Sequence, residues 1–483
     1  MAYFFEPLEI LNLLVGFNPW WTGKPFAIPE FKRLAHEICV DYIQESSLRR
    51  AILLSGPRRV GKTTILLQIA NSLIKVGYDP KSILYLSLDH PLLKLLSLSK
   101  ILELYQQSIQ QEGKPVVLLL DEIQYAKDWE TEIKLMVDHQ PNFKILATGS
   151  ASCVYHNKLA ESGVGRWITV PIPTLSFYEF IHIRGENTPA ISPRLKLNDL
   201  FLMSHGDFVT LASKLRRLLP LFQRYLLVGG FPETAREENI NLCQRLLRED
   251  VVERVLKRDM TALFGVRNIN ELEKLFIYLC LHTGGILNHK TCADALGTSA
   301  ATVANHLALL EKANLIYRLS PCNAGGKKIL KARYKYYLTD AALRNAVLLR
   351  GEEILTDSKE MGVIVETTVL RHLYAYYYRD TPEILYWRDK THKEKEIDII
   401  VRSPSYIFPF EVKYSEQPKL GEESGLSLYC KKEKIKTAFW VTKNEADFAL
   451  SQFDKIDTKV LKIPAHILCY LLGQAERLLW IGK

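Results

Sequence analysis

The sequence predicts an α/β protein in which a parallel β-sheet covered by helices is followed by smaller domains. Between residues 50 and 185, four short apolar runs alternate with helical patterns, which is typical of strands joined by crossover helices. A glycine-rich loop follows one of these runs directly, and an acid pair ends another. The chain has 483 residues, too many for one ordinary core, so we expect two to four domains.

Composition narrows the class of protein. A chain that is 47% hydrophobic and 24% charged is typical of a soluble globular protein, which excludes disordered and fibrous classes. No apolar run is long enough to span a bilayer, and the acids near the N-terminus argue against an export signal, so we expect a cytoplasmic protein without a membrane partner. The eight cysteines show no metal-ligand spacing and are expected to be reduced thiols. The net charge of +9 suits a nucleic-acid partner, but many other enzymes are equally basic.

The sheet is expected to be built from four buried strands with helices between them. The predicted strands are residues 51–55, 83–87, 116–120 and 144–148, and the predicted helices include 64–76 and 99–111. A polar stretch at 185–194 contains two prolines and indicates a loop. Residues 211–260 indicate helices that break at 229–232.

The glycine-rich loop fits G-x-x-x-x-G-K-[ST] at every fixed position and lies between a predicted strand and a predicted helix, as a phosphate-binding P-loop requires. Its glycines let backbone N–H groups approach phosphates, Lys62 supplies a cation and Thr63 offers a hydroxyl to Mg²⁺. The alternative is a chance glycine-rich turn. The predicted ATP-binding residues are Gly56, Pro57, Arg58, Arg59, Val60, Gly61, Lys62, Thr63 and Thr64.

The acid pair supplies the second half of a nucleotide site. Asp121 is expected to hold Mg²⁺ together with Thr63, and Glu122 to orient and deprotonate the attacking water. On its own, the pair could equally be a strand end that faces solvent. Because the P-loop lies on the same predicted sheet, we expect a P-loop NTPase with ATP and Mg²⁺ as cofactors.

Two further residues are candidates for catalysis. Ser150, or less plausibly Thr148, ends the next strand and could sense the γ-phosphate or its water. Arg166 could neutralise transition-state charge as an arginine finger. An ordinary ion-paired surface arginine is the alternative for Arg166.

Several motifs together resemble those of a family of archaeal and bacterial AAA+ ATPases. They are residues 56–63, 118–124, 147–150, Arg166, 173–180 and 229–233. The resemblance begins near residue 20 and covers most of the chain. It implies an AAA+ core, then a winged helix, then a C-terminal α/β domain related to PD-(D/E)XK nucleases. On this basis we expect an ATPase core at 1–205, a helical connector at 206–265, the winged helix at 266–350 and the nuclease-like domain at 351–483.

A helix-turn-helix pattern supports the winged helix. Predicted helices at 289–296 and 299–313 are joined by a turn at Gly297, and a hairpin follows at 315–319 and 334–338. Residues 266–345 contain eleven Lys and Arg against five Asp and Glu, and part of this excess lies in the wing at Lys327, Lys328, Lys331 and Arg333. We expect DNA contact, mainly to the backbone, because the second helix offers few base-reading side chains. The alternative is a module that only packs against the ATPase.

Residues near the C-terminus suggest a nuclease centre. Asp398 begins one predicted strand, and Glu411 and Lys413 lie on the next, which resembles the PD-(D/E)XK core. Glu366 shares a helical stripe with Leu370, so it should face inward and needs a cation or hydrogen-bond donors. We expect Glu366, Asp398 and Glu411 as metal ligands, and Glu411 with Lys413 as catalytic groups. An inactive relic and chance spacing are the alternatives.

Two functional interpretations remain open from sequence. The first is an ATPase that couples its nucleotide cycle to DNA binding and has a possible nuclease activity. The second is a slow NTP-dependent switch or protein-interaction module with an inactive nuclease-like domain. A homo-oligomer is compatible with both.

Overall fold

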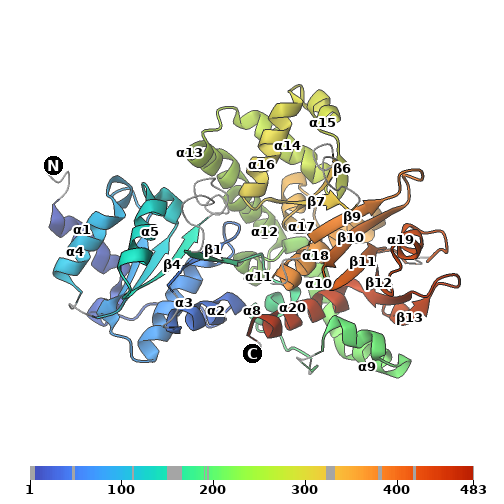
Figure 1. The fold of residues 1–483 in the computed structure, drawn as a ribbon, viewed down its shortest axis with the longest axis horizontal. Coiled ribbons are helices and arrows are strands. Elements are labelled where there is room, and N and C mark those ends of the chain that lie inside the picture. Colours follow the sequence, from blue (N-terminus) through green and yellow to red (C-terminus); the bar gives the residue numbers. More distant parts are fainter. Residues whose placement is uncertain are drawn as a thin grey trace. The chain divides into compact units, whose positions relative to one another are not determined.

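The computed structural model describes residues 6–45, 49–110, 114–149, 166–189, 191–192, 195–322, 332–378, 383–416 and 420–481 (Figure 1). The chain divides into two compact units. The first comprises residues 1–172 with 312–314, and the second 173–311 with 315–483. The finer division into four domains stays a prediction. No helix within the described ranges is long and apolar enough to cross a membrane.

The first unit contains a five-stranded, fully parallel sheet in the order β2-β3-β4-β1-β5. Its strands are β1 (Ala51–Ser55), β2 (Ile83–Ser87), β3 (Val116–Asp121), β4 (Phe143–Gly149) and β5 (Trp167–Pro171). The four predicted strands agree with the first four to within one residue at each end. The edge strand β5 was not predicted, because it is mostly half-buried and carries no clear apolar run.

Helices cover both faces of this sheet, as right-handed crossovers between parallel strands require. They are α1 (Pro7–Phe17), α2 (Leu34–Gln44), α3 (Lys62–Lys75), α4 (Leu98–Ser108) and α5 (Trp129–His139). Figure 1 shows α3 and α5 on opposite sides of the strands. β1 and β3 are buried along their whole length. Because all strands run the same way, their carboxyl ends share one edge, where the P-loop begins.

The second unit contains a nine-stranded mixed sheet in the order β13-β14-β12-β11-β10-β9-β7-β8-β6. Its strands are β6 (Gly285–Leu287), β7 (Ile316–Pro321), β8 (Tyr334–Leu338), β9 (Glu383–Arg388), β10 (Glu396–Ser403), β11 (Tyr406–Val412), β12 (Thr437–Thr442), β13 (Ala449–Gln452) and β14 (Lys459–Pro464). The predicted hairpin corresponds to β7 and β8, which pair antiparallel. Parallel pairing of β7 with β9 joins the β6-β8-β7 sheet to the C-terminal strands, an arrangement that sequence did not predict.

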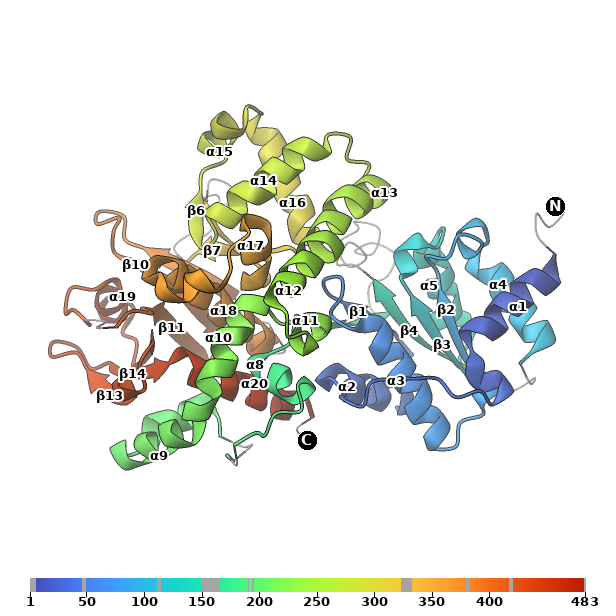
Figure 2. The same ribbon diagram turned by 180° about the vertical axis from the view of Figure 1, so that it is seen from behind.

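The helices of the second unit fall into three groups. Before the helix-turn-helix come α8 (Phe177–Ile183), α9 (His205–Leu215), α10 (Leu219–Val228), α11 (Pro232–Arg236), α12 (Ile240–Leu246) and α13 (Met260–Phe264). A π-helical segment, Leu247–Asp259, joins α12 to α13, and Figure 2 shows the three as one rod. α14 (Ile269–Leu281) comes next, and α15 (His289–Leu296) and α16 (Ala300–Lys312) match the two predicted helices of the helix-turn-helix. α17 (Ala341–Leu348), α18 (Ser358–Tyr377), α19 (Gly425–Glu433) and α20 (Ala465–Ile481) complete the unit.

The motifs at 173–180 and 229–233 contact each other inside the second unit. The Leu175 N–H donates to the Gly230 carbonyl at 2.5 Å, and the Gly230 N–H donates to Asp340 at 2.9 Å. A Cβ at Gly230 would lie 2.5 Å from the Leu175 carbonyl oxygen, which only glycine avoids. These motifs therefore have a packing role in this unit.

Candidate functional site

The P-loop connects β1 to α3 and is shaped by its two glycines. A Cβ at Gly56 would lie 2.1 Å from the carbonyl oxygen of Ile172, so no larger residue fits there. Gly61 has φ of 92°, in the left-handed region that favours glycine, and it directly precedes the first residue of α3. The N–H groups at the start of α3 have no partner within the helix and carry partial positive charge. This end of β1 is therefore built to receive an anion.

Lys62 lies over the loop that precedes it. Its side chain is buried, and Nζ donates to the carbonyl oxygens of Gly56 at 3.0 Å and Pro57 at 2.8 Å. The ammonium is thus held at the mouth of the loop, where it can exchange these oxygens for those of a phosphate.

The other residues of the predicted loop have different environments. Val60 is fully buried, and its carbonyl accepts a hydrogen bond from Arg33 at 3.1 Å. Arg58 donates to the Tyr125 hydroxyl at 3.2 Å, while Arg59 is exposed with φ of 63°. Thr64 is half-buried in the first turn of α3.

Asp121 is the centre of the polar contacts at this sheet edge. Its Oδ2 accepts from Thr63 Oγ1 at 2.7 Å and from the Tyr85 hydroxyl at 3.1 Å, and its Oδ1 accepts from Thr148 Oγ1 at 2.5 Å. The structure thus brings together Thr63 and Asp121, the predicted Mg²⁺-binding pair. Burial raises the pKa of Asp121, and the hydrogen bonds from Thr148 and Thr63 oppose that shift. A carboxylate with hard oxygen neighbours at this position suits Mg²⁺ chemically.

Glu122 is held by its backbone as well as by its side chain. Its φ of 55° lies in the left-handed region, which is uncommon for a residue with a Cβ and is found at functional sites. The Glu122 N–H donates to Thr148 Oγ1 at 2.9 Å, and the Gln124 side-chain amide donates to Glu122 Oε2. The carboxylate is half-buried beside Asp121, as a water-activating base requires.

Sequence reasoning underestimated two residues here. Thr148 is fully buried and links Asp121 to Glu122 through one hydroxyl, so it positions both acids. Tyr85 was missed, although a tyrosine in the buried run at 83–87 needs a partner for its hydroxyl. The predicted sensor Ser150 lies outside the described residues.

Arg166, the predicted arginine finger, lies at the edge of the sheet opposite the P-loop. Arg166 precedes β5, and its carbonyl accepts from the N–H of Ala51 at 2.9 Å, at the amino end of β1. The P-loop leaves the carboxyl end of the same strand. The guanidinium instead forms an exposed ion pair with Asp138, 2.8 Å from Nε. This pair agrees with the alternative of an ion-paired surface arginine, and the role of an arginine finger stays a prediction.

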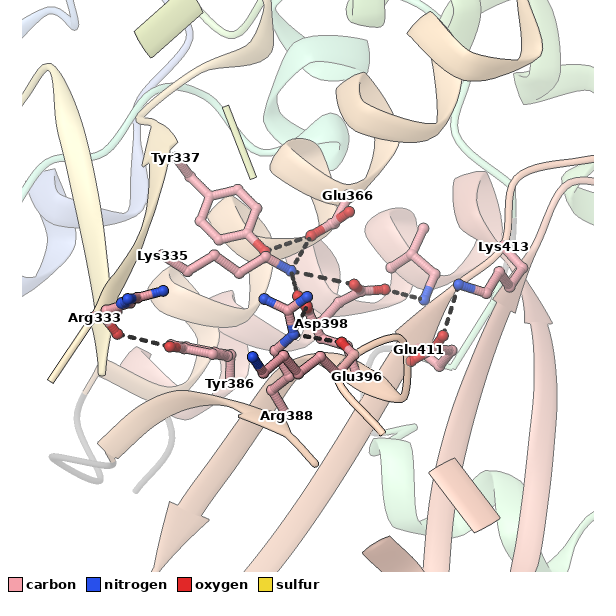
Figure 3. A network of polar contacts seen from close by, with 12 residues as sticks. Arg333, Lys335, Tyr337, Glu366, Tyr386, Arg388, Glu396, Asp398, Glu411 and Lys413 are labelled. Atoms are coloured by element: carbon pink, nitrogen blue, oxygen red, sulfur yellow. Dashed lines mark hydrogen bonds and ion pairs between the residues drawn. The ribbon is translucent and has the colours of Figure 1, made fainter. Parts of the chain in front are cut away.

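A second cluster of charges lies in the second unit, where β8, β10, β11 and α18 converge (Figure 3). The structure brings Glu366, Asp398 and Glu411 together, as predicted, and adds Glu396 and Lys335. The Lys335 ammonium contacts Glu366 at 3.0 Å, Glu396 at 2.9 Å and Asp398 at 3.3 Å. Glu366 also accepts from the Tyr337 hydroxyl. Its predicted need for a cation and donors is therefore met by side chains of β8.

Glu411 and Lys413 form the other half of this cluster. Lys413 Nζ contacts Glu411 Oε1 at 2.7 Å, and Asp398 Oδ2 accepts from the Val412 N–H at 3.0 Å. Burial, reinforced by the charge of Asp398, raises the pKa of Glu411 to about 8. Burial and Asp398 also raise the pKa of Glu366, against the opposing effect of Lys335.

The predicted metal site does not fit a divalent ion well. No group of three or more His, Cys, Asp or Glu among the described residues is arranged to hold a metal. Both Asp398 oxygens have protein donors, and Lys335 lies between three of the carboxylates. Sequence contained a signal for Lys335: it lies two residues before Tyr337, so the two side chains share one face of a strand that is otherwise aromatic and aliphatic.

Comparison with known families bears on both units. Residues 48–181 match the model of a family described as an AAA domain. The match spans the P-loop, Asp121, Glu122 and Thr148, so all four parts of the site described above lie in the region that is similar to AAA domains. Residues 219–353 and 361–465 match two domains of unknown function, DUF8612 and DUF4143.

Relatives share the chain beyond the AAA domain. The uncharacterized protein MJ1637 of Methanocaldococcus jannaschii is 25% identical over 85% of this chain and 84% of its own length. An uncharacterized protein of Haemophilus influenzae is 25% identical over 78% of this chain and 86% of its own length. The chain is therefore similar to these proteins across both units.

Solved structures resemble the chain more weakly. AMPPCP-bound DnaA from Aquifex aeolicus is 19% identical with a TM-score of 0.27, covering 59% of this chain and 90% of that one. The S. cerevisiae Hsp104-ADP complex is 17% identical with a TM-score of 0.30, covering 59% and 50%. Because both TM-scores are low, nothing about activity or partners follows from them.

Proposed function

We propose that the chain is an ATPase that binds Mg²⁺-ATP at the carboxyl edge of its parallel sheet and hydrolyses it. The observation that carries this proposal is the series of contacts from Thr63 to Asp121, to Thr148 and on to Glu122, beside the ammonium of Lys62. These groups are the ones that phosphoryl transfer to water needs, because positioning and charge stabilisation supply most of its catalysis.

Each residue has a distinct role in this proposal. The P-loop N–H groups and Lys62 bind the β- and γ-phosphates, and Thr63 and Asp121 hold Mg²⁺, which would neutralise charge on the phosphates. Glu122 accepts a proton from the attacking water. Thr148 positions both acids, a role that differs from that of a γ-phosphate sensor.

Replacement of Glu122 by Gln tests hydrolysis. We expect ATP to bind with little change in affinity while turnover falls about 100-fold or more, because only the proton acceptor is removed. ATP binding and phosphate release are measured on the same sample. Glu103→Gln, which changes an exposed glutamate of α4 paired with Lys100, is the matched control and should turn over normally. Normal turnover by Glu122→Gln would remove the assigned base.

We further propose that the second unit binds nucleic-acid backbone through the segment from α14 to β8. The order α14-β6-α15-α16-β7-β8, with β8 between β6 and β7, supports this proposal, because a helix-turn-helix followed by a small sheet is the arrangement expected of a winged helix. Gly297 makes the turn between α15 and α16 with φ of 67°. On α16 the exposed side chains are Ala300, Ala301, Asn305 and Ala308, which favour contact with phosphates over base reading.

Residues 266–345 expose less basic charge than their sequence suggests. Lys335 is buried among carboxylates, Arg344 is buried with Glu360, and Arg318 pairs with Glu311. Lys327, Lys328 and Lys331 lie outside the described residues. The described residues that remain exposed and basic are Arg267, Lys274, Lys290 and Arg333.

DNA affinity measured against salt concentration tests this second proposal. In Glu122→Gln loaded with ATP, we expect sequence-independent binding that weakens with salt. The double change Lys290→Ala, Arg333→Ala should lower the salt slope by about 1 for each phosphate that the protein no longer neutralises. A DNA affinity that changes neither with salt concentration nor with the two substitutions would contradict the proposal. Such a result would favour the alternative of an NTP-dependent switch with a protein partner.

A further inference from the structure

The buried lysine of β8 has a complete set of acidic partners. Lys335 is 2% exposed, and its ammonium meets one carboxylate from α18 (Glu366) and two from β10 (Glu396 and Asp398). An ammonium has three N–H donors, so three carboxylates saturate it. Its Nζ also lies 5.4 Å from the centre of the Tyr337 ring. Figure 3 shows these side chains converging on the lysine.

The position of this ammonium is incompatible with a metal ion at the same place. Oxygen ligands lie about 2.0–2.6 Å from Mg²⁺ or Ca²⁺, and the ion must be shared by several of them. Three of the carboxylates that could share an ion instead lie 2.9–3.3 Å from Lys335 Nζ. A metal there would put two cations within contact distance of each other and would leave the lysine buried without a partner, which is costly.

Strand pairing fixes the backbone from which the Lys335 side chain extends into the cluster. β8 is the central strand of the β6-β8-β7 sheet, where Lys335 lies opposite Ile286 on one side and Leu319 on the other. The Arg333 carbonyl accepts from the Tyr386 hydroxyl of β9 at 2.6 Å, which fixes the start of the same strand. The Lys335 backbone can move away from the cluster only if β8 separates from both of its neighbours, and the three ion pairs hold the ammonium in place.

We propose that Lys335 permanently takes the position of a divalent cation in the nuclease-like cluster, so that this cluster is a metal-free joint between the β6-β8-β7 sheet and the C-terminal strands. The joint neutralises acids on α18 and β10 with a cation from β8. The β6-β8-β7 sheet and the C-terminal strands therefore move as one body. The chain does not cut nucleic acid by a metal-dependent reaction. This inference goes beyond the proposed ATPase function and does not depend on it.

Mn²⁺ binding to nucleotide-free protein tests the proposal directly. Titration calorimetry of the wild-type chain and of Asp398→Asn should give the same isotherm, because no ion binds at the cluster. Lys335→Met should gain an Mn²⁺ site that disappears when Asp398→Asn is added. The matched control, Lys413→Met, removes the half-exposed lysine of the neighbouring pair and should gain no such site. Mn²⁺ binding by the wild type that is abolished in Asp398→Asn or Glu411→Gln would overturn the proposal, as would a folded Lys335→Met that gains no site.

Folding of the variants gives a second, independent readout. Lys335→Met removes the buried cation that three carboxylates share, of which Glu396 keeps a second one in Arg388, 3.8 Å away, so its melting temperature should fall well below that of Lys413→Met. Adding Glu366→Gln and Glu396→Gln removes the uncompensated charge and should restore part of the stability. If the triple variant melts no higher than Lys335→Met, or does not fold either, the charge-balancing role is contradicted.

An assay of nucleic-acid cleavage tests the expected lack of metal-dependent nuclease activity. Linear, supercoiled and branched DNA are incubated with Mg²⁺ or Mn²⁺ and either the wild type or Glu411→Ala, Lys413→Ala. We expect no products, or equal products from both proteins owing to contamination, whereas wild-type cleavage that the double variant lacks would overturn the proposal. ATP turnover is followed in the same samples, so that failure of the ATPase and failure of this inference are told apart.

Discussion

Thr148 shows how one hydroxyl can organise a catalytic edge. It donates to Asp121 and accepts from the N–H of Glu122, and it is fully buried on β4, the strand between β1 and β3. A valine of the same shape would leave both partners unsatisfied.

Thr148→Val should therefore lower both stability and turnover. We expect the free energy of unfolding to fall by about 1–3 kcal/mol, because a buried donor and a buried acceptor are left without their partner. Turnover should fall while ATP binding persists, because Lys62 and the P-loop are unchanged. Denaturant unfolding and phosphate release measure the two effects. Thr148→Ser keeps the hydroxyl and should recover most of the turnover; failure to do so would contradict the positioning role.

The raised pKa of Glu411 predicts how the free energy of unfolding depends on pH. Its pKa is raised to about 8 by burial and by Asp398, so in the folded protein it holds a proton that the unfolded chain releases near the ordinary glutamate pKa of 4.5. Between these values the folded state binds more protons, and the free energy of unfolding contributed by Glu411 falls as pH rises. Glu411→Gln should flatten this dependence and stabilise the protein most near pH 8. An unchanged slope between about pH 5 and 8 would contradict the assignment.

At the scale of elements, the contact between the motifs at 173–180 and 229–233 makes a packing prediction. Gly230→Ala should destabilise the protein by about 1–3 kcal/mol, because its Cβ would meet backbone, which cannot move aside easily. Gly362→Ala is the matched control: it lies in α18 with nothing within 4 Å of its Cβ, and should stabilise by about 0.5–1 kcal/mol. Thermal unfolding measures both, and equal effects would contradict the packing role.

Elements with strong local signals could be predicted from sequence. β1 to β4 are continuous apolar runs, and α15 and α16 have apolar positions at helical spacing, so their types and bounds are confirmed. β5 and the pairing of β7 with β9 could not be found this way, because an edge strand carries little pattern and strand partners distant in sequence leave no local mark.

The functional residues, too, could be predicted only where the local sequence carries a signal. Lys62, Thr63, Asp121 and Glu122 belong to motifs with fixed spacing, and the structure brings them to one edge. The position of Arg166 could not be predicted, because β5 itself was not predicted. Arg166 directly precedes β5 and so lies at the amino ends of the parallel strands, away from the P-loop. Lys335 was counted among the basic residues of the winged-helix segment, and only the packing of β8 beside α18 and β10 identifies its partners.

At the scale of the whole molecule, the chain combines the proposed nucleotide site in one unit with the proposed metal-free charge cluster in the other. Similarity to MJ1637 extends over 85% of the chain, so relatives share both units. An ATP cycle that changes nucleic-acid affinity would link the two activities that we propose. That link is tested by the salt-dependent binding of ATP-loaded Glu122→Gln.

The central claim is that the P-loop and Lys62 bind the phosphates of ATP. Equilibrium titration of the purified chain with ATP, compared with Lys62→Ala, measures this most directly. We predict saturable binding by the wild type and an affinity about tenfold to a hundredfold weaker in the variant, because a charge-assisted hydrogen bond to phosphate is removed. Absence of ATP binding by the wild type, or equal affinity in the two proteins, would contradict the account.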